Sequence, residues 1–202
     1  MNILHLQTGL FGEQSVSRQL GDKIVARLQQ ENSDATVINR DLITTPIQHL
    51  DAEILLAGGT EADAQTEKQQ VELALTETLL EELFAADVVV IGAPMYNFSI
   101  PSQLKAWLDR VAQAGRTFRY TEAGPEGLVK GKKVYLASAR GGIYSEGAAA
   151  AMEYQESYLK TVLGFLGMTD VTIIRAEGVN LSPEARNNAI EAASSEISAL
   201  SA

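Results

Sequence analysis

The residues best suited to chemistry lie in three short loops. The first loop, residues 7–17, places serine hydroxyls and backbone N–H groups at the start of an amphipathic stretch. A helix start of this kind suits an anion, because the helix dipole and the unpaired N–H groups both favour negative charge. The loop lacks a Gly-Lys-Ser/Thr sequence, so it suits a monophosphate better than a magnesium-bound triphosphate. The alternative is that Ser15 or Ser17 serves only as a helix cap.

The second loop, residues 93–101, carries aromatic side chains between two prolines. Pro94 and Pro101 stiffen the loop, so the backbone N–H groups between them can face a ligand. Tyr96 and Phe98 are suited to border a planar ring. The alternative is that these aromatic side chains simply cover the top of the sheet.

The third loop, residues 138–144, contains the pair Gly141 and Gly142, which permits a close approach of the backbone to a ligand. Paired glycines also occur in ordinary turns, so the pair alone is a weak signal. Each of the three loops follows a predicted strand, and ligands of open α/β sheets bind beyond the carboxyl ends of the strands. Their joint occurrence predicts a ligand site.

Composition excludes several other kinds of chemistry. The chain has no cysteine, and its two histidines, His5 and His49, lie far apart, so we predict no metal site, disulfide or cysteine nucleophile. A net charge of −10 argues against a nucleic-acid partner. The sequence contains no run of about 18 apolar residues, so we predict no membrane span. We therefore expect a cytoplasmic protein that would need a borrowed cofactor for redox chemistry.

Apolar runs and amphipathic stretches alternate along the chain. Five runs predict strands: residues 3–6, 35–38, 88–91, 134–137 and 171–174. The third lacks polar alternation, which is typical of a parallel strand covered on both faces. Apolar residues at helical spacing predict helices over 16–28 and 154–165. A capping box at 66–69 and a cap at 182–184 each predict the start of a helix. A further helix is predicted to have Pro101 in its first turn and to stop at Gly115.

Five such alternations predict a doubly wound α/β fold. With no internal repeat or linker, residues 1–202 are interpreted as one domain. Residues 41–65 are long for a crossover connection, which indicates a functional loop or a partial helix. Residues 115–131 form a second irregular, turn-rich excursion.

The whole chain resembles the bacterial FMN-dependent azoreductases, which are flavodoxin-like FMN-dependent NADH:quinone and azobenzene reductases. The residues that carry the resemblance are 93–98, 117–122 with 124–128, and 140–143, together with 41–42 and 163–167. The resemblance implies a flavodoxin-like three-layer α/β/α sandwich with a five-stranded parallel sheet in the order 2-1-3-4-5. It also implies a homodimer.

The resemblance further implies a tightly bound, non-covalent FMN. Its phosphate and ribityl chain would be held by Gly9, Ser15, Val16 and Ser17, its ring lined by Met95, Tyr96, Asn97 and Phe98, and its pyrimidine side closed by Ala139, Arg140, Gly141 and Gly142. Phe118, Tyr120, Tyr144 and Phe165 are candidates for the substrate pocket, which could extend across a dimer interface. The family often has serine where Gly9 and Ala139 stand, so we expect weaker or water-replaced contacts at these two positions.

The implied reaction is ping-pong, with NADH as the electron donor and no catalytic side chain, because flavin N5 carries the hydride. Quinones would take two electrons in one turn, an azo bond would need two rounds to give two amines, and nitroaromatics are further candidate acceptors. An alternative is a flavodoxin-type electron carrier without its own substrate, against which the chain length, residues 115–131 and the pocket aromatics argue. A response-regulator-like domain would need clustered acidic residues where Thr8 and Gly9 stand.

The stretch between Arg40 and Lys68 contains no lysine or arginine. If this stretch borders the nucleotide site, nothing in it can pair with the 2′-phosphate of NADPH, which favours NADH. The alternative is an acidic, solvent-facing surface with nucleotide specificity set elsewhere.

Overall fold

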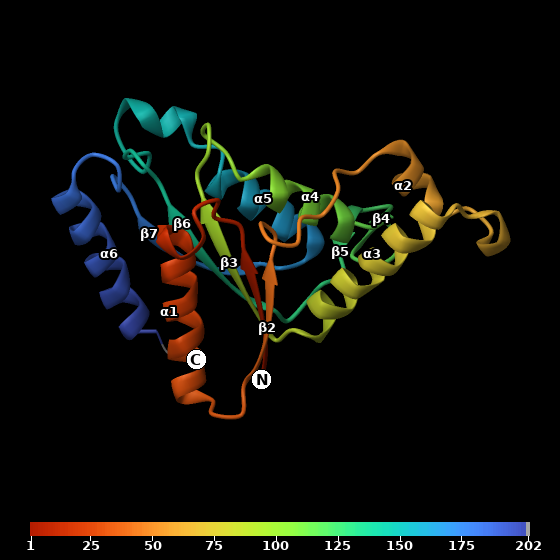
Figure 1. The fold of residues 1–202 in the computed structure, drawn as a ribbon, viewed down its shortest axis with the longest axis horizontal. Helices are drawn as coiled ribbons and strands as arrows, with labels where there is room; N and C mark the ends of the chain where they lie inside the picture. The colour runs from red at the N-terminus through yellow and green to blue at the C-terminus, as the bar shows by residue number, and fades with distance from the viewer. Residues whose placement is uncertain (201–202) are drawn as a thin grey trace.

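Five parallel strands form the central sheet in the computed structural model, which describes residues 1–200 (Figure 1). The strands are β1 (Asn2–Gln7), β2 (Thr36–Asp41), β3 (Val88–Pro94), β6 (Lys133–Ala139) and β7 (Asp170–Ala176). Their order is β2-β1-β3-β6-β7. Because β4 and β5 lie outside this sheet, the order corresponds to the predicted 2-1-3-4-5, which is confirmed.

Helices cover both faces of the sheet. They are α1 (Val16–Glu31), α2 (Ala52–Ala57), α3 (Glu67–Ala85), α4 (Ser102–Val111), α5 (Glu156–Leu166) and α6 (Pro183–Ser198), with short 3₁₀ turns η1 (Gly12–Gln14), η2 (Ala62–Ala64) and η3 (Ala148–Met152). Figure 1 shows α1 and α6 on one face and α3, α4 and α5 on the other. Each face has its own apolar core, and every residue of β3 between them is buried, as its lack of polar alternation predicts.

The strand register brings the starts of the three loops to the same edge of the sheet. Ala93 pairs with Ser138 and Pro94 with Ala139, so the second and third loops leave neighbouring strands side by side. β3 has β6 on one side and β1 on the other, so the first loop, which follows β1, lies next to the second. The sheet therefore presents the three loops as one surface at its carboxyl edge.

Several local signals in the sequence are confirmed. Thr66 and Gln69 form the predicted capping box at the start of α3, and Ser182 caps α6 through its side chain. Gly167, with a φ of 103°, ends α5 in the left-handed conformation. The stop predicted at Gly115 is wrong, because α4 already ends at Val111.

The two irregular stretches contain structure of their own. Residues 41–65 include α2, so the partial-helix interpretation is confirmed. The turn-rich excursion holds an antiparallel hairpin of β4 (Phe118–Thr121) and β5 (Gly124–Gly127). Proline and glycine in β5 are poor strand signals, which is why the sequence pattern did not reveal it. Among residues 1–200, no helix is both long enough and apolar enough to cross a membrane.

Candidate functional site

A pair of buried hydroxyls lies at the start of α1. Ser15 occupies the N-cap position, yet its side chain makes no capping hydrogen bond. Its Oγ instead lies 3.0 Å from Oγ of Ser17, and both residues are buried. The interpretation of Ser15 as only a helix cap is therefore wrong. The first N–H groups of α1 have no partner within the helix, so hydroxyls and N–H groups together form a site suited to an anion.

Gly9 allows the end of β1 to approach this hydroxyl pair closely. A Cβ at Gly9 would lie 2.0 Å from Oγ of Ser15 and 2.6 Å from Cβ of Ser15. A Cβ position is set by the backbone, so a side chain at position 9 would force the start of α1 to move. With Ser15 in its present position, a serine therefore does not fit at position 9.

The second loop contains a tight turn with two left-handed residues. The backbone N–H groups of Tyr96 and Ser99 each donate to the other residue's carbonyl oxygen, at 2.9 and 3.1 Å. Between them, Asn97 has a φ of 49° and Phe98 a φ of 72°. This region is uncommon for a bulky residue, and such conformations concentrate at ligand sites. The Tyr96 hydroxyl accepts from the N–H of Leu10 at 3.1 Å, which joins the second loop to the first.

Two cavities flank this turn. One, of about 240 Å³, lies between the second and third loops and is lined by Met95, Asn97, Phe98, Gly141, Gly142, Tyr144 and Asn180. The other, of about 540 Å³, is lined by Leu10, Met95, Tyr96, Asn97, Ile100, Pro101, Ser102 and Gln103. Phe98 is 44% exposed and its ring meets that of Tyr144 edge-on at 6.2 Å, so Phe98 borders the cavity and does not cover the sheet.

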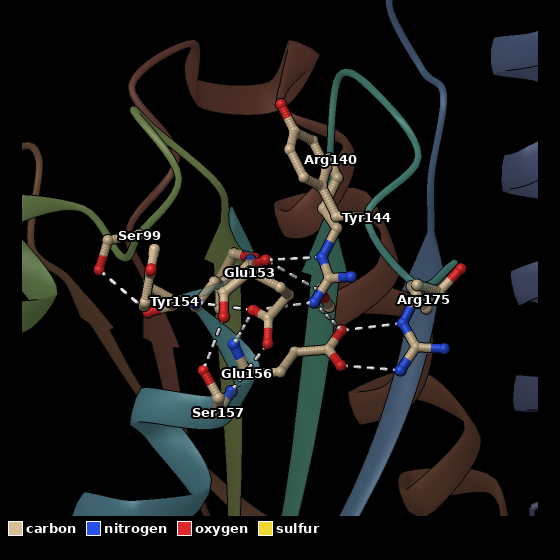
Figure 2. A network of polar contacts seen from close by, with 12 residues as sticks. Ser99, Arg140, Tyr144, Glu153, Tyr154, Glu156, Ser157 and Arg175 are labelled. Atoms are coloured by element: carbon tan, nitrogen blue, oxygen red, sulfur yellow. Dashed lines mark hydrogen bonds and ion pairs between the residues drawn. The ribbon is translucent and has the colours of Figure 1, made fainter. Parts of the chain in front are cut away.

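The side chain of Arg140 points away from the cavity into a cluster of charged side chains. Figure 2 shows its guanidinium beside Glu153 and Glu156, with Arg175 on the other side of Glu156. The backbone N–H of Arg140 donates to Ala176, and its carbonyl oxygen accepts from the N–H of Val179. The Arg140 side chain is therefore held by carboxylates, so a contact of Arg140 with the flavin would have to come from its backbone. The cavity is instead faced by Gly141 and Gly142.

Two carboxylates around Arg140, those of Glu156 and Glu177, have lowered pKa values. Burial acts to raise the pKa of Glu156, but hydrogen bonds from Arg175 and Ser138 and the charge of Arg140 outweigh it and lower the pKa. The pKa of Glu177 is lowered in the same way, against burial, by hydrogen bonds from Ser145, Tyr144 and Arg140. In residues 1–200, no group of three or more histidine, aspartate or glutamate side chains is placed to hold a metal ion.

Of the four predicted pocket aromatics, only Tyr144 lines the cavity. The other three pack together, with ring centroids 5.6 Å apart for Phe118 and Tyr120 and 4.5 Å apart for Phe118 and Phe165. Helix α5 starts beside the candidate site, because Gln155 just before it bonds to Ala93 at the end of β3. Phe165 lies in the last turn of α5, so the trio lies away from the carboxyl edge of the sheet, toward its amino edge. A single chain does not bring these three residues into the cavity.

Sequence reasoning missed the segment between the third loop and α5. Gln155 is fully buried and links the ends of β3 and β6, while Glu153 accepts from the backbone N–H groups that begin α5. No spacing pattern marks these residues, because their partners lie up to 62 positions away in the chain.

The family model described as "Flavodoxin-like fold" matches residues 1–200. This match agrees with the strand order and with the loops at the carboxyl edge of the sheet. The chain therefore belongs to the flavodoxin-like family.

Similar proteins narrow the assignment. The chain is 58% identical to the FMN-dependent NADH:quinone oxidoreductase of Azospirillum brasilense, covering 99% of this chain and 97% of that one. It is 56% identical to FMN-dependent NADH:quinone oxidoreductase 1 of Idiomarina loihiensis, covering 98% of each. Among solved structures, an azoreductase from Bacillus anthracis superposes with a TM-score of 0.88 at 31% identity, covering 98% of this chain and 97% of that one. Within the flavodoxin-like fold, the chain belongs to the FMN-dependent NADH:quinone oxidoreductase family.

Proposed function

We propose that the chain binds FMN and uses NADH to reduce quinones and to cleave aromatic azo compounds to amines. The observation that carries the proposal is the meeting of the three loops at one edge of the sheet. The first loop holds the buried Ser15–Ser17 hydroxyl pair and is joined to the second through Leu10 and Tyr96, and a cavity lies between the second and third loops. A solved FMN-dependent NADH-azoreductase from Bacillus anthracis, in complex with FMN, has the same fold, with a TM-score of 0.85, 28% identity and coverage of 98% of each chain. When bound, FMN would supply the redox chemistry by accepting two electrons from NADH and passing them to the acceptor.

The residues present fit the phosphate end of FMN. Ser15 and Ser17 offer two hydroxyls, and the start of α1, including Val16, offers backbone N–H groups and the positive end of the helix dipole. A phosphate ester would accept hydrogen bonds from all of these donors. Gly9 keeps β1 close enough for the loop to close around the phosphate.

The residues of the second and third loops fit a planar ring. Met95 and Asn97 line both cavities, and Phe98 and Tyr144 stand at the rim of the smaller one. The glycine pair lets the backbone approach the polar edge of the ring. In this arrangement Ala139 is buried at the end of β6, where the third loop begins, and Phe98 and Tyr144 would border the space in which the acceptor binds.

The nucleotide donor is proposed to be NADH in preference to NADPH. Lys68, the first cation after residue 40, is held by Asp51 and Glu53 at 2.9 Å each, and these hydrogen bonds raise its pKa to about 12. Arg40, at the other end of the stretch, pairs with Glu82. Both cations are already paired with carboxylates, so a 2′-phosphate would have to displace these partners. A comparison of kcat/KM for the two nucleotides tests this, and a clear preference for NADPH would overturn it.

A homodimer would complete the acceptor pocket. Tyr120 is 75% exposed on the hairpin, far from its own chain's cavity, so a second copy could receive it together with Phe118 and Phe165. Sedimentation of the purified protein tests the dimer, and a monomer at the assay concentration contradicts it.

We also propose that residues 1–202 act as one domain, that nitroaromatics are further acceptors, and that the enzyme works in the cytoplasm, where NADH is available.

The proposed kinetic mechanism is ping-pong, because NADH and the acceptor would use the same slot in turn. Initial rates measured at several fixed concentrations of benzoquinone should give parallel double-reciprocal lines against NADH. Intersecting lines would show that both substrates bind together and would contradict the shared slot.

A further inference from the structure

Gln155 connects the two loops that would hold the flavin ring. Its side-chain nitrogen donates to the carbonyl oxygen of Ala93, at the start of the second loop. Its side-chain oxygen accepts from Nε of Arg140 at 2.8 Å, in the third loop. Because Gln155 is fully buried, water does not compete for either hydrogen bond. One amide therefore ties the starts of both loops together.

Glu177 closes the third loop on itself. One of its carboxylate oxygens lies 2.8 Å from Nη1 of Arg140, which precedes the glycine pair. The same oxygen accepts from the backbone N–H of Tyr144 at 2.9 Å, and the other accepts from the hydroxyl of Ser145. A single carboxylate thus holds both ends of the Gly141–Gly142 segment.

The chain segment that carries Gln155 is also attached to the second loop. The backbone N–H of Tyr154 donates to the carbonyl oxygen of Phe98 at 3.0 Å, and the hydroxyl of Ser99 donates to the carbonyl oxygen of Tyr154 at 3.1 Å (Figure 2). Glu153 accepts from the backbone N–H groups of Gln155 and Glu156 at 2.7 and 2.6 Å. These bonds fix the segment to the start of α5.

We propose that Arg140, Gln155 and Glu177 form a positioning clasp that sets the spacing of the second and third loops and thereby the affinity for the flavin ring. The proposal rests on the proposed function, since it concerns the cavity in which the ring would bind. The three side chains act through the backbone and need not touch the cofactor. Without the clasp, a glycine pair and a strained two-residue turn have other conformations available.

Charge balance identifies Glu177 as the member to remove. Arg140 and Arg175 face three carboxylates, those of Glu153, Glu156 and Glu177. Removing Glu177 leaves two cations with two anions, whereas removing Arg140 leaves three buried or half-buried carboxylates with one cation. Uncompensated buried charge destabilises a fold strongly, so Glu177→Ala is the substitution that tests the loops and spares the fold.

The test compares FMN binding to the apoproteins of the wild type, Glu177→Ala and a matched control, Glu82→Ala. Glu82 pairs with Arg40 between α3 and β2, and its side chain is 12% exposed, against 14% for Glu177. Glu177→Ala should weaken FMN binding roughly tenfold or more in a fluorescence titration and change the visible circular dichroism of the bound flavin. Glu82→Ala should lower the thermal midpoint but keep FMN affinity within about threefold of the wild type.

Each result bears on the clasp. Wild-type affinity and an unchanged flavin spectrum in Glu177→Ala would overturn it, as would an equal loss of affinity in Glu82→Ala. If Glu177→Ala does not fold, Glu177→Gln decides the matter, because it keeps an acceptor for Tyr144 but loses the charge. We expect roughly fivefold weaker binding for that variant, and wild-type affinity would overturn the clasp. Failure of the wild type itself to bind FMN would refute the proposed function, whereas wild-type binding with an unaffected variant would refute only the clasp.

Discussion

Gly9, Ser15 and Ser17 show how single positions define the proposed phosphate site. The hydroxyl pair could be predicted from the sequence as an anion site, because serines followed a strand and opened a helix. The reason for Gly9 could not, since the distance from its missing Cβ to Ser15 depends on how α1 packs on β1. Likewise, nothing in the local sequence indicated that the Arg140 side chain would point into a cluster of carboxylates.

Gly9→Ser should therefore weaken FMN binding, although it introduces a hydroxyl. The new Cβ would displace Cβ of Ser15 and separate the hydroxyl pair, so we expect roughly a tenfold loss of affinity in a titration of the apoprotein. Gly58→Ser is the control, because a Cβ there has nothing within 4 Å and its φ of −64° suits any residue. Unchanged affinity in Gly9→Ser would contradict the proposed role of this close approach.

His5 should make stability depend on pH. Burial lowers its pKa from the ordinary value of 6.5, although Asp22 and Asn39 partly oppose the shift. Between the lowered pKa and 6.5 the unfolded chain binds more protons than the folded chain, so the free energy of unfolding should rise with pH in that window, by at most about 1.4 kcal/mol per pH unit. His5→Gln should flatten this rise in urea unfolding, and the exposed His49→Gln should preserve it. A wild-type curve that is level or falls across the window would contradict the prediction.

At the scale of elements, the strands and most helices could be predicted because their signals are local. Buried β3 was marked by continuous apolar residues, α3 by its capping box and α6 by Ser182 and Pro183. No local signal marked the β4–β5 hairpin. It packs at the end of α5, where a Cβ at Gly127 would lie 2.2 Å from the backbone N of Gly167. That contact joins segments 40 residues apart, and no sequence pattern encodes it.

Helices α3 and α4 are joined by a buried ion pair. Nη1 of Arg110 lies 2.6 Å from a carboxylate oxygen of Glu72, and Nε of Arg110 donates to the Thr76 hydroxyl at 2.9 Å. Glu72→Ala leaves a buried guanidinium without its counter-charge and should lower the free energy of unfolding by about 3–5 kcal/mol. The double variant Glu72→Leu with Arg110→Met should lose much less, because it removes both charges. Denaturant unfolding measures both, and equal losses in the two proteins would contradict the explanation.

At the scale of the whole molecule, the fold brings three loops that are distant in sequence to one edge of the sheet. Parallel strand order follows from alternating strands and helices, so the meeting of the loops could be predicted. The placement of Phe118 and Tyr120 beside Phe165 could not be predicted, because it depends on how the β4–β5 hairpin packs at the end of α5. For that reason the acceptor pocket is proposed to need two copies of the chain.

The most direct test of the proposed function is the visible absorption spectrum of the purified protein, reconstituted with FMN and followed under anaerobic conditions. The two loops and the hydroxyl pair predict that FMN stays with the protein through gel filtration. Addition of NADH should bleach the flavin absorption, and benzoquinone should restore it. A protein that retains no FMN, or whose bound FMN is not bleached by NADH, would contradict the proposed function.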